Sequence, residues 1–185
     1  NRQLFIEQLE LLLRLSARDA KPLAVLFLNL DNFSRINESL GRNAGDLLLK
    51  EVGKRLIGCL RSSDLLAHYV NSNEGMNISR FGGDEFAFVL SQLDSIDAAG
   101  MVAQRVTDIL VEPIIIEGHE LVISSSIGIA IAPRNGMNGE ELLRCASAAM
   151  QQAKTTSNSN FLFYKEYMAS TNQDELKIES ELRKA

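Results

Sequence analysis

Two adjacent carboxylates follow a pair of glycines in the segment RFGGDEFAFVL, residues 80–90. Gly82 and Gly83 can adopt the positive φ of a tight hairpin turn, and they let a ligand come close to the backbone. Asp84 and Glu85 would then be presented, between two apolar runs, to a metal ion and a phosphate. Gly-Gly-Asp is also an ordinary turn sequence, so an exposed hairpin tip without a function is the alternative.

A second polar cluster follows the apolar run LAVLFLNLD, residues 23–31, which is typical of a strand covered on both faces. The segment 29–46 starts at the carboxyl end of this run, where open α/β sheets place their ligands. Asp31 lies there, and together with the acidic hairpin it could share one Mg²⁺, which prefers one or two carboxylates plus phosphate oxygens. The free N–H groups of the following loop and helix start would suit a triphosphate.

Apolar periodicity predicts helices and strands that alternate along the chain. The fold class predicted from this order is α+β, an α/β sandwich with a mixed central sheet of about five strands surrounded by helices. Helices are expected at 5–13, 33–40, from an N-cap pair of Asn43 and Asp46 to Cys59, from about 95 to 111, and at 139–156. Strands are expected at 23–31, 65–70, 77–81, 85–91, 120–132 and 161–165.

Length and composition predict one soluble domain. The 185 residues are 45% hydrophobic and 23% charged, and the net charge of −5 argues against nucleic acid as a partner. Cys59 and Cys145 fall in helical apolar patterns, which favours buried free thiols and a reducing compartment. The apolar runs are too short to span a bilayer. We expect a cytoplasmic location, either as a free protein or as the cytoplasmic part of a membrane-bound sensor. The chain starts at Asn1 without a Met, which indicates one part of a longer protein.

The motifs and their order resemble the GGDEF domain, the diguanylate cyclase family of bacterial cyclic di-GMP signalling. The resemblance covers essentially the whole chain. Five segments carry it: Asn1–Phe5, LFLNLDNFSRINESLGRNAGD, RFGGDEF, SSSIGIAIAP and AAMQQAK. It implies a nucleotidyl-cyclase or palm-like fold, with residues 1–165 as the GGDEF domain. Residues 166–185 are similar to a helical linker that leads into an EAL phosphodiesterase domain, which implies a GGDEF–EAL tandem protein.

The resemblance also implies an activity, the condensation of two GTP molecules into cyclic di-GMP with loss of pyrophosphate. Each domain would hold one GTP, and two domains would meet face to face as a homodimer. Mg²⁺ (or Mn²⁺) would orient the phosphates and neutralise developing charge, while a carboxylate helps to deprotonate the attacking hydroxyl. Cyclic di-GMP would be the product and, in this family, also an inhibitor.

Carried over by position, the resemblance gives roles to individual residues. Asp84 matches the metal-binding acid and Glu85 the catalytic one, while Asn37 and Asp46 match the residues that hydrogen-bond the guanine. Asp46 has an alternative reading as a favourable charge near a helix N-terminus. The other positions carried over are the metal-contacting Asn29 and Leu30, and, around the phosphates, Asn32, Phe33, Gly82, Gly83 and Lys154. Arg42 stands where the family has a His, and it would restore some positive charge near the substrate.

Several positions depart from the family pattern, and three of them remove charge around the triphosphate. Asn29 stands where the family has a metal-binding Asp, Ser34 where it has a Lys, and Asn158 where it has an Arg. Because ligand charge is a main determinant of affinity for such cations, the site is weakened. We therefore expect weak or lost turnover and a role as a GTP-binding regulatory module. A fully active diguanylate cyclase is the alternative.

The segment Arg61-Ser62-Ser63-Asp64 matches the RxxD motif of the family, which implies a product-inhibition site in which Arg61 and Asp64 bind cyclic di-GMP. The alternative reading is an ordinary helix end. An insertion at 68–79 separates this motif from the acidic turn, and it could extend the hairpin, cover the inhibitory site or contact a second copy.

Overall fold

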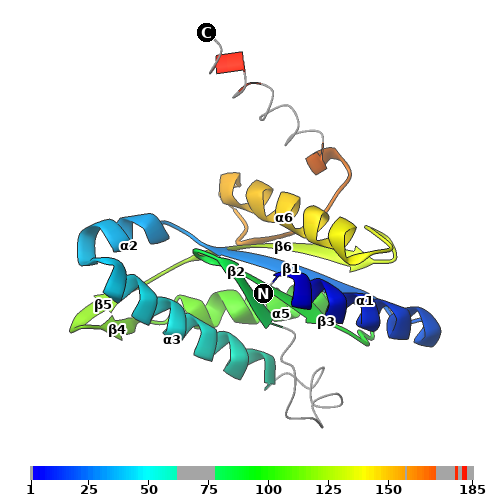
Figure 1. The fold of residues 1–185 in the computed structure, drawn as a ribbon, viewed down its shortest axis with the longest axis horizontal. Coiled ribbons are helices and arrows are strands. Elements are labelled where there is room, and N and C mark those ends of the chain that lie inside the picture. The colour runs from blue at the N-terminus through cyan, green and yellow to red at the C-terminus, as the bar shows by residue number, and fades with distance from the viewer. Residues whose placement is uncertain (1, 62–77, 157, 170–177, 179–180, 183–185) are drawn as a thin grey trace.

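A computed structural model describes residues 2–61, 78–156, 158–169, 178 and 181–182. The described elements are α1 (Arg2–Asp19), β1 (Leu23–Leu30), α2 (Phe33–Leu40), α3 (Arg42–Arg61), β2 (Ile78–Gly82), β3 (Glu85–Leu90), α5 (Asp97–Leu110), β4 (Ile114–Ile116), β5 (His119–Leu121), β6 (Ser125–Ala132), α6 (Gly139–Thr155) and β7 (Phe161–Phe163) (Figure 1).

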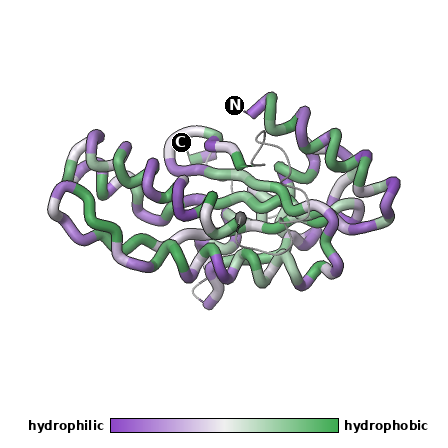
Figure 2. The backbone as a smooth tube through the Cα atoms, turned by 90° about the horizontal axis from the view of Figure 1, so that it is seen from below, coloured by the Kyte–Doolittle hydropathy of each residue, from purple (hydrophilic) through white to green (hydrophobic). Residues whose placement is uncertain are grey.

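The described strands form a five-stranded sheet in the order β2-β3-β1-β6-β7. β1 pairs antiparallel with both β3 and β6, whereas β6 and β7 are parallel. The predicted α+β sandwich with a mixed sheet is confirmed. Every residue of β1 and β6 is buried, and β1 is a nearly continuous apolar run, whereas β6 begins with Ser125 and Ser126. Figure 2 shows hydrophobic segments running through the middle of the molecule.

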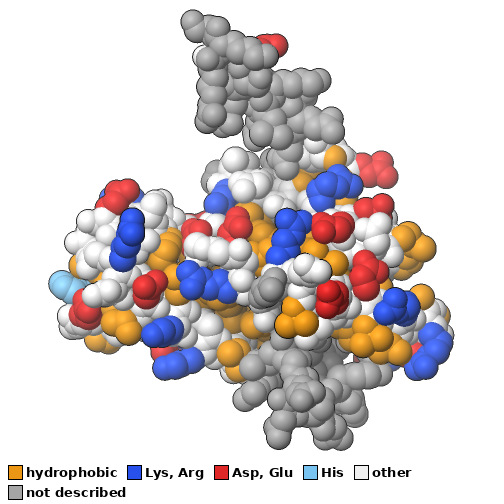
Figure 3. Space-filling model, in the orientation of Figure 1, with side chains coloured by type: hydrophobic (Ala, Val, Ile, Leu, Met, Phe, Trp, Pro, Cys, Tyr) orange, Lys and Arg blue, Asp and Glu red, His pale blue; other side chains and the backbone are white. Residues whose placement is uncertain are grey.

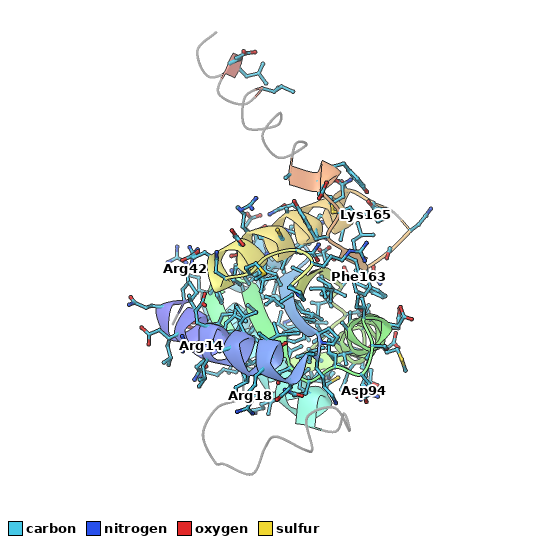
Figure 4. All side chains as sticks on the ribbon, turned by 90° about the vertical axis from the view of Figure 1, so that its right-hand side faces the viewer. Arg14, Arg18, Arg42, Asp94, Phe163 and Lys165 are labelled. Carbon is cyan, nitrogen blue, oxygen red and sulfur yellow. The ribbon has the colours of Figure 1, made fainter. Side chains whose placement is uncertain are left out.

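Helices cover both faces of this sheet. One hydrophobic core joins the sheet to α3 and α5, and a second joins it to α1 and α6. Figure 4 shows these layers from one end, with Phe163 of β7 on the α5 side, where Gly100 leaves room for its ring. Alternate residues of β1 face opposite sides, so Leu26, Leu28 and Leu30 belong to the first core, and Val25 and Phe27 to the second.

The start of α6 is fixed by side chains from two elements. The Asn138 side chain accepts the N–H of Glu141 at 2.9 Å, as an N-cap residue does. The Glu10 carboxylate of α1 accepts the N–H of Gly139 at 2.6 Å. α1 therefore supplies part of the capping of α6, in addition to its apolar packing.

The predicted strand over 120–132 is wrong as a single element. β5 pairs with β4 in a separate two-stranded sheet, whereas β6 begins only at Ser125. The hairpin turn is Glu117-Gly118, where both residues have positive φ, and the sequence analysis did not identify it. Val122 between the two strands is 65% exposed, so its β-branched character did not mean burial in the sheet.

The predicted N-cap pair of α3 is also wrong. The helix starts at Arg42, after Gly41 with φ of +88°, so Asn43 and Asp46 lie inside it. There is no acidic residue in the first turn, which weakens the reading of Asp46 as a charge that interacts with the helix N-terminus. The other predicted helices and strands agree with the described elements to within a few residues, except that α1 continues to Asp19, and β4 was not predicted. The strand predicted at 65–70 and most of the insertion 68–79 and of the tail lie outside the described residues.

Candidate functional site

The acidic turn is a tight hairpin between β2 and β3. Gly82 and Gly83 have φ of +136° and +51°, values that residues with a side chain rarely adopt. Both are exposed, and a Cβ at either position would meet nothing within 4 Å. The glycines therefore serve the backbone conformation and leave open space at the turn. The Arg80 guanidinium donates to the Gly83 carbonyl at 2.9 Å and closes the hairpin, a contact that the sequence analysis missed.

The hairpin is fixed to the rest of the sheet by an aromatic contact. The Phe81 ring packs edge-on against Phe5 of α1 and Phe27 of β1, with centroid distances of 5.4 and 5.5 Å. Such edge-to-face pairs are favourable in geometry and in buried area. The phenylalanine that precedes the glycines thus sets the position of the acids that follow them.

The structure brings the acidic turn and the end of β1 together. Asn29 is the direct antiparallel partner of Glu85, and the Leu30 N–H donates to the Asp84 carbonyl at 3.1 Å. Asn29 is 5% exposed, whereas Asp84 and Glu85 are half-buried. The Asn29 side chain makes no hydrogen bond with any residue in the described part of the chain. Its amide is therefore available to a ligand.

Asp31, just beyond β1, has a different environment. Its Oδ2 accepts a hydrogen bond from the Ser124 hydroxyl and its Oδ1 one from the Ser126 hydroxyl, both at 2.8 Å. The Asp31 N–H donates to the Ser124 carbonyl at 2.9 Å. In the sequence these serines stand out only as part of a motif. The signal is the run Ser124-Ser125-Ser126 at the start of β6, although the run alone does not show that two of its hydroxyls reach Asp31.

Asn37 of α2 lies against the first turns of α3. Asn32 has φ of +58° and begins α2, and the buried Phe33 fixes the first turn of that helix. The Asn37 amide oxygen lies directly over Gly45, where any Cβ would overlap it. The Gly41 N–H also donates to the Asn37 carbonyl at 3.0 Å. Asp46 is exposed one residue after Gly45, and Arg42 is exposed at the helix start.

Lys154 is exposed in the last turn of α6 and forms no ion pair with a residue that the structure describes. α6 lies directly against β6 because Gly128 has no side chain, and a Cβ there would collide with the backbone of Ala146 and Met150. Arg61 ends α3, but its side chain and Asp64 lie outside the described residues. The structure therefore says nothing of the predicted inhibitory pair.

The residues present fit a divalent cation only with help from a nucleotide. Within the described ranges, no group of three or more His, Cys, Asp or Glu side chains could hold a metal ion. One carboxylate at Asp84, the amide of Asn29 and the carbonyl of Leu30 would offer only a sparse set of oxygen donors. Mg²⁺ is commonly held by one or two carboxylates plus substrate phosphates, so this donor set suits a metal that arrives with a triphosphate.

Comparison with known families gives a clear result. The family profile described as "Diguanylate cyclase, GGDEF domain" matches residues 1–160. The chain belongs to the GGDEF family, and it is a diguanylate-cyclase-like domain of bacterial cyclic di-GMP signalling.

Two relatives from Pseudomonas aeruginosa illustrate its context. The chain is 40% identical over 165 residues to the cyclic di-GMP phosphodiesterase NbdA, and the aligned region covers 89% of this chain and 19% of NbdA. It is 35% identical over 185 residues to the bifunctional diguanylate cyclase/cyclic di-GMP phosphodiesterase MucR, and the aligned region covers 100% of this chain and 25% of MucR. The chain thus spans a quarter or less of these relatives.

Solved structures share the fold. The GGDEF domain of TpbB from P. aeruginosa superposes with a TM-score of 0.82 at 33% identity, covering 94% of each chain. An EAL/GGDEF domain protein from M. capsulatus gives a TM-score of 0.70 at 37% identity, covering 89% of this chain and 99% of that one.

None of the helices in the described part of the chain has the length and apolar character needed to span a bilayer.

Proposed function

We propose that this domain binds Mg²⁺–GTP with weak or absent turnover, and that it regulates a neighbouring domain. The observation that carries the proposal is the amide of Asn29. This amide lies opposite Glu85, at the position where the family has a second metal-binding carboxylate. An amide oxygen can coordinate Mg²⁺ but brings no charge, and affinity at such sites depends on ligand charge.

Asp31 does not replace the missing carboxylate in this proposal. Each of its oxygens accepts a serine hydroxyl at 2.8 Å, so binding a cation there would compete with two hydrogen bonds. Ser34 and Asn158 are both exposed, and neither supplies the positive charge that the family pattern has at its position. Both the metal and the phosphates therefore lose favourable charge relative to that pattern.

The remaining contacts support binding of a nucleotide. Asn37 and Asp46 would hydrogen-bond the guanine, with Asn37 placed by its contact with Gly45. The Asn32 and Phe33 backbone, Gly82, Gly83, Arg42 and Lys154 would contact the phosphates, and Asn29, Leu30 and Asp84 the metal ion.

The relatives support a regulatory role. NbdA from P. aeruginosa and PdeR from Escherichia coli are both named cyclic di-GMP phosphodiesterases, although each contains a region that matches this chain. In the proposed arrangement, GTP binding here controls an EAL domain in the same chain, linked through residues 166–185. Cyclic di-GMP would act through Arg61 and Asp64.

An active cyclase is the second candidate, and the intact turn favours it. Gly82 and Gly83 keep the positive φ of the acidic hairpin, and Arg80 closes it. In that case two copies would meet face to face, and Glu85 would accept the proton of the 3′-hydroxyl that attacks the α-phosphate of the other GTP. Mg²⁺ would stabilise the charge that develops on the phosphates. The α–β phosphoanhydride bond breaks, and pyrophosphate leaves.

One experiment separates the two candidates. The protein is incubated with Mg²⁺ and GTP at concentrations that permit dimers, and cyclic di-GMP is measured by chromatography. We expect little or no product from the wild type and measurable product from Asn29→Asp combined with Ser34→Lys. Robust product from the wild type would contradict the proposal that turnover is weak or absent. GTP binding, measured in parallel by calorimetry, should be lost in Asp46→Ala; a wild type that binds no GTP would contradict both candidates.

A further inference from the structure

We infer that Asp31 is a positioning residue, and that its hydrogen bonds to Ser124 and Ser126 fix the strand end that presents Asn29 and Leu30 to the metal and nucleotide. We call this set of three side chains the serine clamp. The inference deepens the proposed function and rests on it. It concerns a carboxylate to which the family resemblance assigned no role.

The serine clamp continues the pairing of β1 with β6 beyond the end of the strand. Regular pairing ends at Leu30–Ser125, and the next residue adds a backbone bond, from the Asp31 N–H to the Ser124 carbonyl at 2.9 Å. The two hydroxyls then occupy both oxygens of the carboxylate at 2.8 Å. Hydrogen bonds to an ionised carboxylate are stronger than neutral ones, so three bonds hold one residue in place.

The clamped residue lies between the two parts of the site. On one side, the Leu30 N–H donates to the Asp84 carbonyl at 3.1 Å, which ties the same strand end to the acidic turn. On the other side, Asn32 follows with φ of +58° and starts α2. Any displacement of Asp31 would therefore move the Leu30 carbonyl relative to Asp84, and also move the first N–H groups of α2.

Packing alone does not fix this part of the chain. A hollow of about 450 Å³ lies between α2 and the β5–β6 segment, lined by Asp31, Asn32, Arg35, Leu40, His119 and Ser124 among others. α2 therefore lacks close packing on this side, whereas Asn37 and Phe33 contact α3 on the other. The serine clamp supplies the constraint where side-chain packing does not.

Two roles for Asp31 make opposite predictions. If it acts by charge, or as a direct ligand of the metal, then Asp31→Asn should be the most harmful change. If it acts by position, the amide of Asp31→Asn can still bond both hydroxyls, because one serine can reorient and accept from the amide nitrogen. Ser124→Ala with Ser126→Ala then does the greater harm, although the carboxylate is kept.

Ser125 provides a matched control. It lies between the two clamp serines, its hydroxyl is buried, and it has no hydrogen-bond partner in the described part of the chain. Ser125→Ala removes the same atom from the same strand without touching the carboxylate. Single Ser124→Ala and Ser126→Ala variants serve if the double variant does not fold.

The test measures GTP affinity with Mg²⁺ by calorimetry and amide hydrogen exchange at residues 30 and 31. For the double serine variant we expect affinity to fall about tenfold and exchange at residues 30 and 31 to rise about tenfold, which exceeds the rise at residues 25–27 that a lower global stability causes. Asp31→Asn should change affinity by less than about threefold, and Ser125→Ala should leave affinity unchanged and should not raise exchange at residues 30 and 31. A larger loss in Asp31→Asn than in the double serine variant would overturn the inference, and so would unchanged exchange at residues 30 and 31. If the wild type binds no GTP, the proposed function fails, but exchange at these two amides still decides whether the clamp holds the strand end.

Discussion

Asn29 of β1 and Glu85 of β3 lie directly opposite each other in the antiparallel register, where β1 approaches its end and β3 begins just after the acidic turn. Directly opposite side chains on one face of an antiparallel pair lie close enough to interact. Replacing the amide by a carboxylate would therefore place two like charges next to each other unless a cation lies between them.

The first prediction follows from this pair. Asn29→Asp should lower the free energy of unfolding in EDTA by about 0.5–1 kcal/mol, through repulsion of the Glu85 carboxylate. For a chain of this size, that is a loss of about 1–4 °C in melting temperature. Mg²⁺ with GTP should reverse the loss, which differential scanning fluorimetry can measure. Asn29→Ala is the control and should show no such recovery. If Asn29→Asp behaves the same with and without Mg²⁺–GTP, then this position does not contact the metal.

The second prediction concerns Gly45. A Cβ here would overlap the Asn37 amide, so Gly45→Ala should displace that side chain and weaken GTP binding about tenfold in calorimetry. Gly53→Ala in the same helix is the control, because its Cβ would meet nothing within 4 Å. It should leave affinity unchanged and stabilise the fold by about 0.5–1 kcal/mol, as Ala does in helix interiors. Unchanged GTP affinity in Gly45→Ala would argue against Asn37 as a guanine contact.

The third prediction concerns the unpartnered hydroxyl of Ser125. A buried hydroxyl without a hydrogen bond costs free energy in the folded state, so its removal should help. We expect Ser125→Ala to raise the free energy of unfolding by about 1 kcal/mol in urea titrations. Ser126→Ala is the comparison, because its hydroxyl donates to Asp31, and it should be destabilising. A loss of stability in Ser125→Ala would mean that the hydroxyl has a partner, such as a buried water.

The fourth prediction concerns the two thiols. Burial raises the pKa of both Cys59 and Cys145 above its ordinary value of 9.0, so the reactive thiolate is disfavoured in the folded state. Iodoacetamide at pH 8 should therefore label neither cysteine in the native protein, and both in urea, as read by mass spectrometry. The raised pKa of each thiol in the folded protein also makes stability depend on pH. The contribution of the neutral thiols to the free energy of unfolding is fully present below pH 9 and is lost as the pH rises through the pKa values of the folded protein. Fast native labelling of either cysteine would show that the helix bearing it opens readily.

The sequence predicted most of the fold because its signals were local. The buried run of β1, the apolar spacing of α6 and the glycine turn at residues 82–83 each indicate their structure within a few neighbouring residues. The β4–β5 hairpin was missed because Glu117-Gly118 is a weak turn signal, and because Val122 made the following segment look continuous with β6.

The sequence named the candidate site residues but could not give the contacts between them. Asn29, Asp84 and Asn37 could be matched by motif, and the structure places the turn that carries Asp84 beside the end of β1, where Asn29 lies. The serine clamp was not predictable, because it depends on the register of β1 against β6, and no residue pattern gives that register. The contact between Asn37 and Gly45 likewise depends on the angle between α2 and α3.

The pairing that brings Asp31 to Ser126 joins residues 95 positions apart in the chain. Closing so long a loop costs entropy that only the assembled sheet can offset, so this end of the site cannot exist in a partly folded chain. A nucleotide bound there would stabilise only complete molecules. A distant substitution such as Gly128→Ala, which forces α6 away from β6, should therefore lower the number of binding-competent molecules.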